Sequence, residues 1–538
     1  MTTVFGNGAD TASYDDFENT DCIIAWGSNA QEAHPVIWNH MRRGVKNGAK
    51  LVVIDPRKLP MAKSATYHLA VKSATDIALA NAMANVIIRE QLYNLEFVQR
   101  VTVWFDEYRQ QVDKYSPEYA EEITGIPAQT IREVARLYAT SARAIIAWTL
   151  GVTEHHNGAD NVHAIINLAL LTGHVGRPGC GLMPLRGQNN VQGGADMGAL
   201  PNKLPGFFDV TDELAREMFE QAWNCIIPPK NGLHLAGMFD AAHMGLMRSV
   251  YIIGENPAQS DANSTAVVDA LTNLDFLVVQ DLFLTKTAAL ADVVLPAAGW
   301  AEVEGTFTNS ERGVQRVRQL VHPPGEARSD IVILQELANR LGENWHYNGA
   351  GDVWDELRRL SPSHFGMSYE RLDEELELQW PCPSLDAPPA RHLHTRLHER
   401  EFGAPAPFVS VEFEPPIEPV DEDYPLVLIT GRRLAFYNTG VMTSDYGDKV
   451  KGQEEVLEIS FEDAERLGIS DGHLVVVSSR RGSVRAPVKV TDKMQAGNVW
   501  LDFHFPNQVN TNVLTNDRYD KKSGVAPYKY TAVRVEKL

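Results

Sequence analysis

The chain has 538 residues, of which 44% are hydrophobic and 22% charged, and its formal net charge is -21 at pH 7. This length is too great for a single hydrophobic core and predicts several domains, while the acidic balance argues against a nucleic-acid partner, because phosphate backbones are bound by clustered Lys and Arg. The chain has no run of eighteen apolar residues and no C-x-x-C pair among its four cysteines, which predicts a cytoplasmic protein with reduced thiols and no membrane segment.

The first part of the chain has the pattern of a strand, a helix and a second strand. The apolar runs 22–26 and 51–54 are the predicted strands, and between them Pro35 suits the first turn of a helix that Asn47-Gly48 ends. Such a unit implies a parallel sheet covered by helices. A further strand is expected at 144–148, and Thr75 is positioned to cap a helix after the second strand.

The strand and helix pattern restarts after residue 198. Three apolar runs, SVYII, LDFLVV and ADVVL, each end in a polar loop. A proline-rich stretch follows and indicates a linker that crosses the surface. After Pro425, short strands with alternating apolar residues predict a small barrel. We therefore expect an α/β protein: two Rossmann-like parallel-sheet domains with helices on both faces (1–188 and 189–390, with a small excursion near 301–328), a linker (391–425) and a C-terminal β-barrel cap domain (426–538).

Polar residues at the carboxyl ends of the predicted strands form the first candidate site, because ligands of open α/β sheets bind there. The first domain offers Gly27, Asn29, Asp55 and Arg57 at its strand ends. Glycine permits close backbone approach, and an acidic residue after the second strand can accept from ribose hydroxyls. The chain has no G-x-G-x-x-G motif, so residues that only turn the chain remain an alternative for this set.

The second domain repeats this arrangement. Its strand ends carry Asn256, Gln280, Asp281 and Thr285. Two further acids, Asp76 and Asp330, stand at predicted helix starts, where a first-turn charge or a helix cap is the simpler interpretation.

The segment RGQNNVQGGADMG, residues 186–198, cannot fill a core, pattern a helix or alternate as a strand. Its amides can satisfy many donors and acceptors, and Arg186 can hold a small planar carboxylate through two parallel hydrogen bonds. The density of amides around one arginine favours a binding site over the alternative of an interdomain loop.

Two groups of histidines are weaker metal candidates. His155 and His156 are adjacent at a strand end and point in different directions, so polar loop contacts are favoured. His392, His394 and His398 lie in the predicted linker, where solvated histidines are the expected reading.

Several segments together share the motifs of one family: WGSNAQEAHP, IDPRK, YIIGENPAQSD, ITGRRLAFYNTGVMT and two long stretches that begin at Thr172 and Val278. On these segments, and over essentially its whole length, the chain resembles the catalytic subunit of the molybdenum or tungsten formate dehydrogenases. Those enzymes bind two molybdopterin guanine dinucleotides (bis-MGD). The string RGQNNVQG is typical of the formate branch, which disfavours another oxyanion or sulfoxide reductase.

The resemblance implies a cofactor contact for each matching residue. One dinucleotide would contact Gly27, Asn29, Asp55, Arg57 and Asp76, and the other Asn256, Gln280, Asp281, Thr285 and Asp330. The barrel would add Arg432, Tyr437, Asn512, Tyr528 and Lys529. Gln188 would lie near the pterins and metal, and Arg186 would orient formate for oxidation to carbon dioxide, or the reverse.

The resemblance also implies parts that this sequence does not match. In the family a Cys or selenocysteine followed by His ligates the metal, just N-terminal to the motif matching GNGA, and a 4Fe-4S cluster lies further upstream. We expect both in a missing N-terminal region or a separate chain, for example after a selenocysteine codon read as a stop, and we expect this chain alone to be inactive. An electron-transfer subunit with iron-sulfur clusters and a diaphorase is the expected partner. The alternative is a noncatalytic relative, as in the large subunit of respiratory NADH dehydrogenase.

Overall fold

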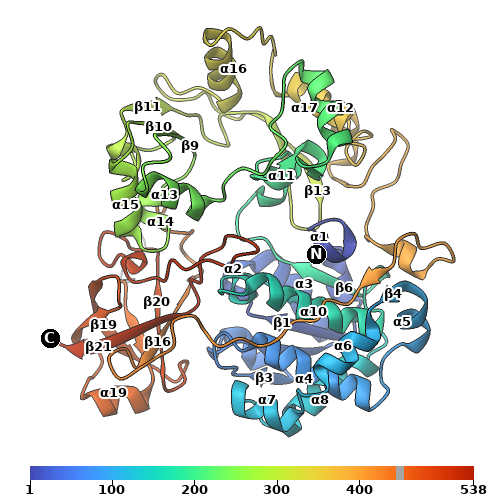
Figure 1. Ribbon diagram of the computed structural model, residues 1–538, viewed down its shortest axis with the longest axis vertical. Coiled ribbons are helices and arrows are strands. Elements are labelled where there is room, and N and C mark those ends of the chain that lie inside the picture. The colour runs from blue at the N-terminus through green and yellow to red at the C-terminus, as the bar shows by residue number, and fades with distance from the viewer. Residues whose placement is uncertain (444–453) are drawn as a thin grey trace. The chain divides into compact units, whose positions relative to one another are not determined.

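The computed structural model describes residues 1–443 and 454–538, and Figure 1 labels many of its helices and strands. The chain divides into two compact units. Unit 1 consists of Met1–Gly187, Gln259–Ala266 and His392–Leu538, and unit 2 of Gln188–Ala258 and Val267–Arg391. Within the described ranges no helix has both the length and the apolar character needed to cross a membrane.

Unit 1 begins with a five-stranded parallel sheet in the order β3-β2-β1-β5-β6, which confirms the predicted strand-helix-strand unit. The strands are β1 (Cys22–Trp26), β2 (Lys50–Ile54), β3 (Tyr67–Leu69), β5 (Ala144–Trp148) and β6 (Gly181–Pro184). Successive side chains of a strand point to opposite faces. Ile24 and Trp26 accordingly lie in one hydrophobic core and Ile23 and Ala25 in another. Both faces are therefore covered.

Helices supply the other half of each core. Those of the first part of the chain are α1 (Thr2–Phe5), α2 (Ala30–Ala33), α3 (Pro35–Lys46), α4 (Asp76–Arg89), α5 (Leu95–Val101), α6 (Phe105–Val112), α7 (Pro117–Thr124), α8 (Ala128–Thr140), α9 (Leu150–Thr153) and α10 (Gly158–Thr172). Pro35 and Asn47 bound α3 as predicted. Thr75 occupies the N-cap position of α4, as predicted, but its side chain makes no capping hydrogen bond, because its hydroxyl donates to the carbonyl of Lys72 at 2.7 Å.

Most residues of the predicted linker 391–425 are exposed or partly exposed, but the segment is anchored at several points that the prediction of a surface crossing does not include. β15 (Ala406–Pro407) pairs with β4 (Thr102–Val103), and Phe408 and Val411 are buried in the core beneath α4 and α10. His392 is not solvated either, because its Nε2 lies 2.9 Å from a carboxylate oxygen of Asp16. The apolar residues between the prolines explain this docking, since they gain more from burial than from a path through water.

The C-terminal part of unit 1 is a closed six-stranded barrel in the order β16-β20-β17-β19-β18-β21, as predicted. Its strands are β16 (Leu426–Gly431), β17 (Leu457–Ile459), β18 (Leu474–Ser478), β19 (Ser483–Val490), β20 (Asn498–Asp502) and β21 (Thr531–Lys537), with α19 (Phe461–Leu467) between β17 and β18. Alternate residues of these strands fill one apolar interior.

Unit 2 contains a second parallel sheet, of three strands in the order β11-β10-β9. These are β9 (Ser249–Ile253), β10 (Phe276–Asp281) and β11 (Val293–Pro296), which confirms the three predicted strands. The helices of unit 2 are α11 (Val191–Asp196), α12 (Glu213–Trp223), α13 (Leu235–His243), α14 (Pro257–Ser260), α15 (Ser264–Thr272, which begins in the part assigned to unit 1), α16 (Asp330–Arg340), α17 (Ala350–Leu360) and α18 (Tyr369–Glu375).

Two further features of unit 2 bear on the sequence predictions. β12 (Gly305–Thr308), β13 (Gly313–Val317) and β14 (Leu378–Gln379) form a small antiparallel sheet where the excursion was expected. The expectation that residues 186–198 form no helix is wrong, because the short helix α11 lies within this segment. Gln192 donates to Asp196 at 2.7 Å, a side-chain pair one turn apart that supports this short helix.

Candidate functional site

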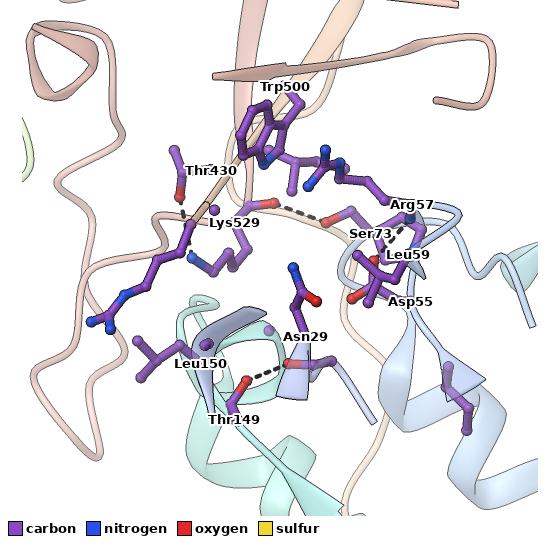
Figure 2. A pocket seen from close by; sticks show the side chains of 18 of the residues that line it. Asn29, Asp55, Arg57, Leu59, Ser73, Thr149, Leu150, Thr430, Trp500 and Lys529 are labelled. Atoms are coloured by element: carbon purple, nitrogen blue, oxygen red, sulfur yellow. Dashed lines mark hydrogen bonds between the residues drawn. The ribbon is translucent and has the colours of Figure 1, made fainter. Parts of the chain in front are cut away.

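A pocket in unit 1 lies at the carboxyl ends of β1, β2 and β5 and is closed by the barrel (Figure 2). It encloses about 940 Å³ of space between its walls, including the part open to solvent. Seven residues predicted from the strand-end loops and from the resemblance line it: Gly27, Asn29, Asp55, Arg57, Asp76, Arg432 and Lys529. The topology thus brings these strand ends together with two segments of the barrel.

The floor of the pocket is backbone. Gly27 has a φ of +53°, and a Cβ built on it would lie 2.6 Å from the carbonyl carbon of Gly151. The Gly27 carbonyl accepts from the Gly151 amide at 3.2 Å and from the Thr149 hydroxyl at 2.6 Å. Only glycine permits this approach, so the loops after β1 and β5 are fixed against each other and a ligand can lie directly on the main chain.

Two buried carboxyl groups line one wall. Burial raises the pKa of Asp55 to about 6, although the Arg57 amide donates to it at 2.9 Å. Burial likewise raises the pKa of Asp76 to about 6, although the Trp26 indole donates to it at 2.7 Å. Asp76 is therefore more than a first-turn helix charge. Both carboxyl groups can accept N–H donors of a ligand, and such donors would favour their ionised forms.

Arg57 connects the strand-end loop to the barrel. Its Nη2 donates to Glu458 at 2.6 Å, and its guanidinium carbon lies 4.0 Å from the ring centroid of Trp500. Figure 2 shows the two side chains next to each other at the pocket. The Nε of Arg57 and the indole Nε1 of Trp500 are buried and have no hydrogen-bond partner in the described parts of the chain. These two donors are therefore available to the acceptors of a ligand.

Lys529 contributes a positive charge that is already paired. Its Nζ lies 2.8 Å from a carboxylate oxygen of Glu154 and 3.2 Å from the Thr430 hydroxyl, and its carbonyl accepts from Ser73 at 2.9 Å. Figure 2 shows Lys529 between Thr430 and Ser73. The ion pair joins the loop after α9 to the segment before β21.

Arg186 follows β6 and is adjacent to Gly187, which lines the pocket. Its guanidinium donates to the carbonyl of Gly8, and its own carbonyl accepts from His34 Nε2 at 2.6 Å. His34 also lines the pocket, so Arg186 is held at the pocket wall through its main chain. Gln188 belongs to unit 2.

Three other residues of the predicted set do not line this pocket. Asn512 donates to the carbonyls of Gln259 and Ser260, at 3.1 and 2.9 Å, and the Tyr528 hydroxyl accepts from Ala262 N at 3.0 Å. These two residues instead hold the segment 259–266 against the barrel. Tyr437 lies beneath the Arg432 guanidinium, whose carbon is 5.7 Å from the ring centroid.

The predicted residues of unit 2 lie at the carboxyl end of its sheet. Gln280 donates to Asp330 at 2.5 Å, and Asn256 accepts from the amide and hydroxyl of Thr287 at 3.1 and 2.8 Å. Ser329, rather than Asp330, caps α16, which leaves Asp330 to bond Gln280.

The two other predicted residues of this edge are held by local hydrogen bonds. Thr285 accepts from Ala288 N at 3.1 Å, and Asp281 accepts from Leu282 N at 2.6 Å. Burial raises the pKa of Asp281. The polar edge is therefore preorganised by bonds among its own residues.

Sequence reasoning assigned no ligand role to Trp500, Thr149, Ser73, Thr430 or to the two pocket histidines, His34 and His155. Thr149 directly follows β5 and so lies at the carboxyl end of that strand, whereas Trp500 and Thr430 come from the barrel and reach the pocket only through its packing against the sheet. In the described residues no group of three or more His, Cys, Asp and Glu side chains could hold a metal ion.

Comparison with known proteins adds the following similarities. A family model described as "Molybdopterin oxidoreductase" matches residues 3–340, and one described as "Molydopterin dinucleotide binding domain" matches residues 426–532. The chain is 43% identical over 541 residues to the F420-dependent formate dehydrogenase subunit alpha of Methanocaldococcus jannaschii, covering 100% of this chain and 80% of that protein. It is 40% identical to formate dehydrogenase H of Escherichia coli, covering 99% and 75%.

Among solved structures, acetylene hydratase from Pelobacter acetylenicus aligns with a TM-score of 0.78 and 22% identity, over 100% of this chain and 80% of that one. At this identity the likeness concerns the fold alone. It extends over both parallel-sheet regions and the barrel.

Proposed function

Because this chain belongs to the molybdopterin oxidoreductase family, and is thus an oxidoreductase, we propose that it is the catalytic region of a formate dehydrogenase alpha subunit. Its reaction is the oxidation of formate to carbon dioxide, or the reverse. The observation that carries this proposal is the similarity of at least 40% identity to two formate dehydrogenases over nearly the whole chain.

The unit 1 pocket supports the binding of one pterin guanine dinucleotide. A ligand of this kind carries amide and amine donors, carbonyl acceptors and phosphates. The pocket offers carboxyl acceptors at Asp55 and Asp76, donors at Arg57 and Trp500 that have no partner among the described residues, and a backbone floor at Gly27. Donors and acceptors therefore fit the group.

The remaining predicted contacts form part of the same proposal. Asn29, Arg432 and Lys529 would contribute to the first dinucleotide from the pocket walls. The polar edge of unit 2 would hold the second one through Asn256, Gln280, Asp281, Thr285 and Asp330. Gln188, Tyr437, Asn512 and Tyr528 remain predicted contacts without a pocket assignment, and the domain boundaries given above also remain predictions.

In the reaction, formate loses two electrons and a proton as carbon dioxide forms. The molybdenum or tungsten centre supplies the two-electron acceptor when it is bound. The role of Arg186 is to hold the formate carboxylate through its two parallel N–H groups, which restricts the substrate to one orientation. The His34 contact at the Arg186 carbonyl fixes the main chain from which that guanidinium extends.

The electrons would pass through iron-sulfur clusters to a separate electron-transfer subunit. A 4Fe-4S cluster and such a partner follow from the resemblance, as does a cytoplasmic location.

The test is the Arg186→Lys variant, made in the complete metal-loaded enzyme. A lysine keeps the charge but cannot form two parallel hydrogen bonds. We expect formate-dependent reduction of an artificial electron acceptor to fall at least about a hundredfold, since one fixed charge-stabilising contact contributes about that much. The dinucleotide and metal contents should stay at the wild-type level. Unchanged kinetics would remove Arg186 from the mechanism, and a wild-type enzyme inactive with formate would overturn the proposed function.

A further inference from the structure

Two histidines line the unit 1 pocket from different loops and share one hydrogen-bonding arrangement. The Nε2 of His34 lies 2.6 Å from the carbonyl oxygen of Arg186, and the Nε2 of His155 lies 3.0 Å from the carbonyl oxygen of Gly151. In both rings the second nitrogen, Nδ1, is buried and has no hydrogen-bond partner in the described parts of the chain.

The carbonyl partners determine where the proton of each ring resides. A carbonyl oxygen can only accept, so each Nε2 must carry a hydrogen and donate it. Burial lowers the pKa of His34 and lowers that of His155 to about 4, so both rings are neutral near pH 7. In a neutral ring with a protonated Nε2, the Nδ1 holds a bare lone pair. Each histidine ring therefore presents a single hydrogen-bond acceptor, Nδ1, because the main-chain carbonyl at Nε2 fixes the tautomer of the ring.

A buried acceptor without a donor costs free energy, and nearly all such groups in native proteins are satisfied. The protein could have used Leu or Met at these two positions if they only filled space. Instead two buried acceptors line a pocket that Arg57 and Trp500 also line, and the Nε and Nε1 donors of those two residues have no hydrogen-bond partner in the described parts of the chain. A pocket with both kinds of unsatisfied group points to a ligand that carries N–H groups as well as oxygen atoms.

We infer that His34 and His155 are ligand-binding residues that accept hydrogen bonds from ring or exocyclic N–H groups of a 2-amino-4-oxo heterocycle bound in the pocket. This inference rests on the proposed function, because pterin and guanine both carry that edge. It assigns the two residues a role in ligand binding beyond the support of backbone carbonyls.

The experiment uses two substitutions at each histidine, which distinguish the contribution of Nδ1 to ligand binding from that of Nε2. Gln can place its amide N–H near the position of Nε2, keeping the bond to the carbonyl while losing the Nδ1 acceptor. Asn can place its amide oxygen near the position of Nδ1, keeping an acceptor while losing the carbonyl contact. His34→Gln, His34→Asn, His155→Gln and His155→Asn are compared with His398→Gln. His398 also bonds a carbonyl through Nε2, at 2.6 Å from Val175 O, and does not line the pocket.

Each variant is expressed as the full chain in a host that makes the dinucleotide. The dinucleotide retained after dialysis is measured by the fluorescence of its oxidised pterin, and GDP binding to the ligand-free chain is measured by calorimetry. Thermal unfolding midpoints report whether each variant is folded. As an independent measurement in the wild-type chain, the ¹⁵N signals of the imidazoles are compared with and without the dinucleotide.

We expect each Gln variant to bind about tenfold more weakly than the corresponding Asn variant, in line with the loss of one buried hydrogen bond. The His398 variant should match the wild type, and the Nδ1 signals of His34 and His155 should shift on loading. If GDP binding shows the same loss, the guanine end contacts the histidines. If only dinucleotide retention falls, the pterin end does.

The reverse order, with weak Asn variants and normal Gln variants, would show that the rings only support carbonyls and would overturn the inference. Equal binding by all variants, or Nδ1 signals that do not move on loading, would also overturn it. If the wild-type chain binds neither dinucleotide nor GDP, the proposed function fails and this inference fails with it.

Discussion

Arg57 and Glu458 form a buried ion pair at 2.6 Å between the loop after β2 and strand β17 of the barrel. The two residues are 401 positions apart in the sequence. Their side chains are 10% and 7% exposed, and Lys493 lies at a longer 3.8 Å from the other oxygen of Glu458. The pair therefore fixes the barrel against the parallel sheet at the pocket itself.

Removing one member should be more harmful than removing both. Arg57→Met leaves the Glu458 carboxylate buried with only the distant Lys493, and we expect it to destabilise unit 1 by about 3 kcal/mol. The double variant Arg57→Met, Glu458→Met should recover most of this loss, since no unpaired charge remains. Thermal unfolding midpoints of the ligand-free proteins measure both effects. A double variant less stable than Arg57→Met would contradict this account.

The stability of the ligand-free chain should fall as the pH rises from about 4 to about 6. Asp55 and Asp76 have a folded pKa of about 6, above the 3.8 of an ordinary Asp, so the folded state holds protons that the unfolded state has released. The native state is therefore favoured below this window and loses that advantage through it. Each residue accounts for up to about 3 kcal/mol, at 1.36 kcal/mol per pKa unit.

Asp76→Asn checks this dependence. It keeps an oxygen for the Trp26 indole but cannot ionise. Urea unfolding midpoints between pH 4 and pH 7 should fall less steeply with pH than those of the wild type, while Asp55 and other buried carboxyl groups with raised pKa values, such as Glu455, still contribute. A wild-type slope in Asp76→Asn would show that its carboxyl is not responsible.

The close approach of Gly27 and Gly151 should not tolerate a side chain. Gly27→Ala would place a Cβ 2.6 Å from the carbonyl carbon of Gly151, at a φ of +53°. We expect a loss of more than about 2 kcal/mol, because strain and crowding add. Gly468→Ala is the matched control, since Gly468 has a φ of +64° but nothing within 4 Å of the added Cβ. Equal losses in the two variants would show that backbone strain alone matters.

Lys529→Met should weaken dinucleotide retention and lower the unfolding midpoint, because Glu154 loses its partner at the pocket. The Lys529 side chain is 11% exposed. Removing one partner of such a buried ion pair costs more stability than removing one partner of an exposed pair, because the remaining charge stays buried without a partner. Lys522→Met removes a similar pair with Asp160, but Lys522 is 56% exposed. Little change is expected there. Retention unaffected by Lys529→Met would exclude Lys529 from the cofactor site.

The hydrogen bonds of His34 and His155 could not be predicted from the sequence. His34 lies within the motif WGSNAQEAHP, and His155 lies in a loop for which the sequence favours polar contacts over metal binding. Neither pattern indicates which ring nitrogen is bonded. That depends on the carbonyls of Arg186 and Gly151, which the fold brings to them.

Residue patterns alone predict the buried strands Cys22–Trp26 and Ala144–Trp148, because both are continuous apolar runs, and they locate Asp55 and Arg57 at a strand end. The sequence also contains the arginine and amide segment from Arg186 onward. The contacts of Arg57 with Glu458 and Trp500, and the pocket that the residues after β1, β2 and β5 share with the barrel, follow only from the packing of distant segments. The physical reason is that periodicity is set by neighbours in the chain, whereas hydrogen-bond partners, burial and pKa shifts are set by neighbours in space.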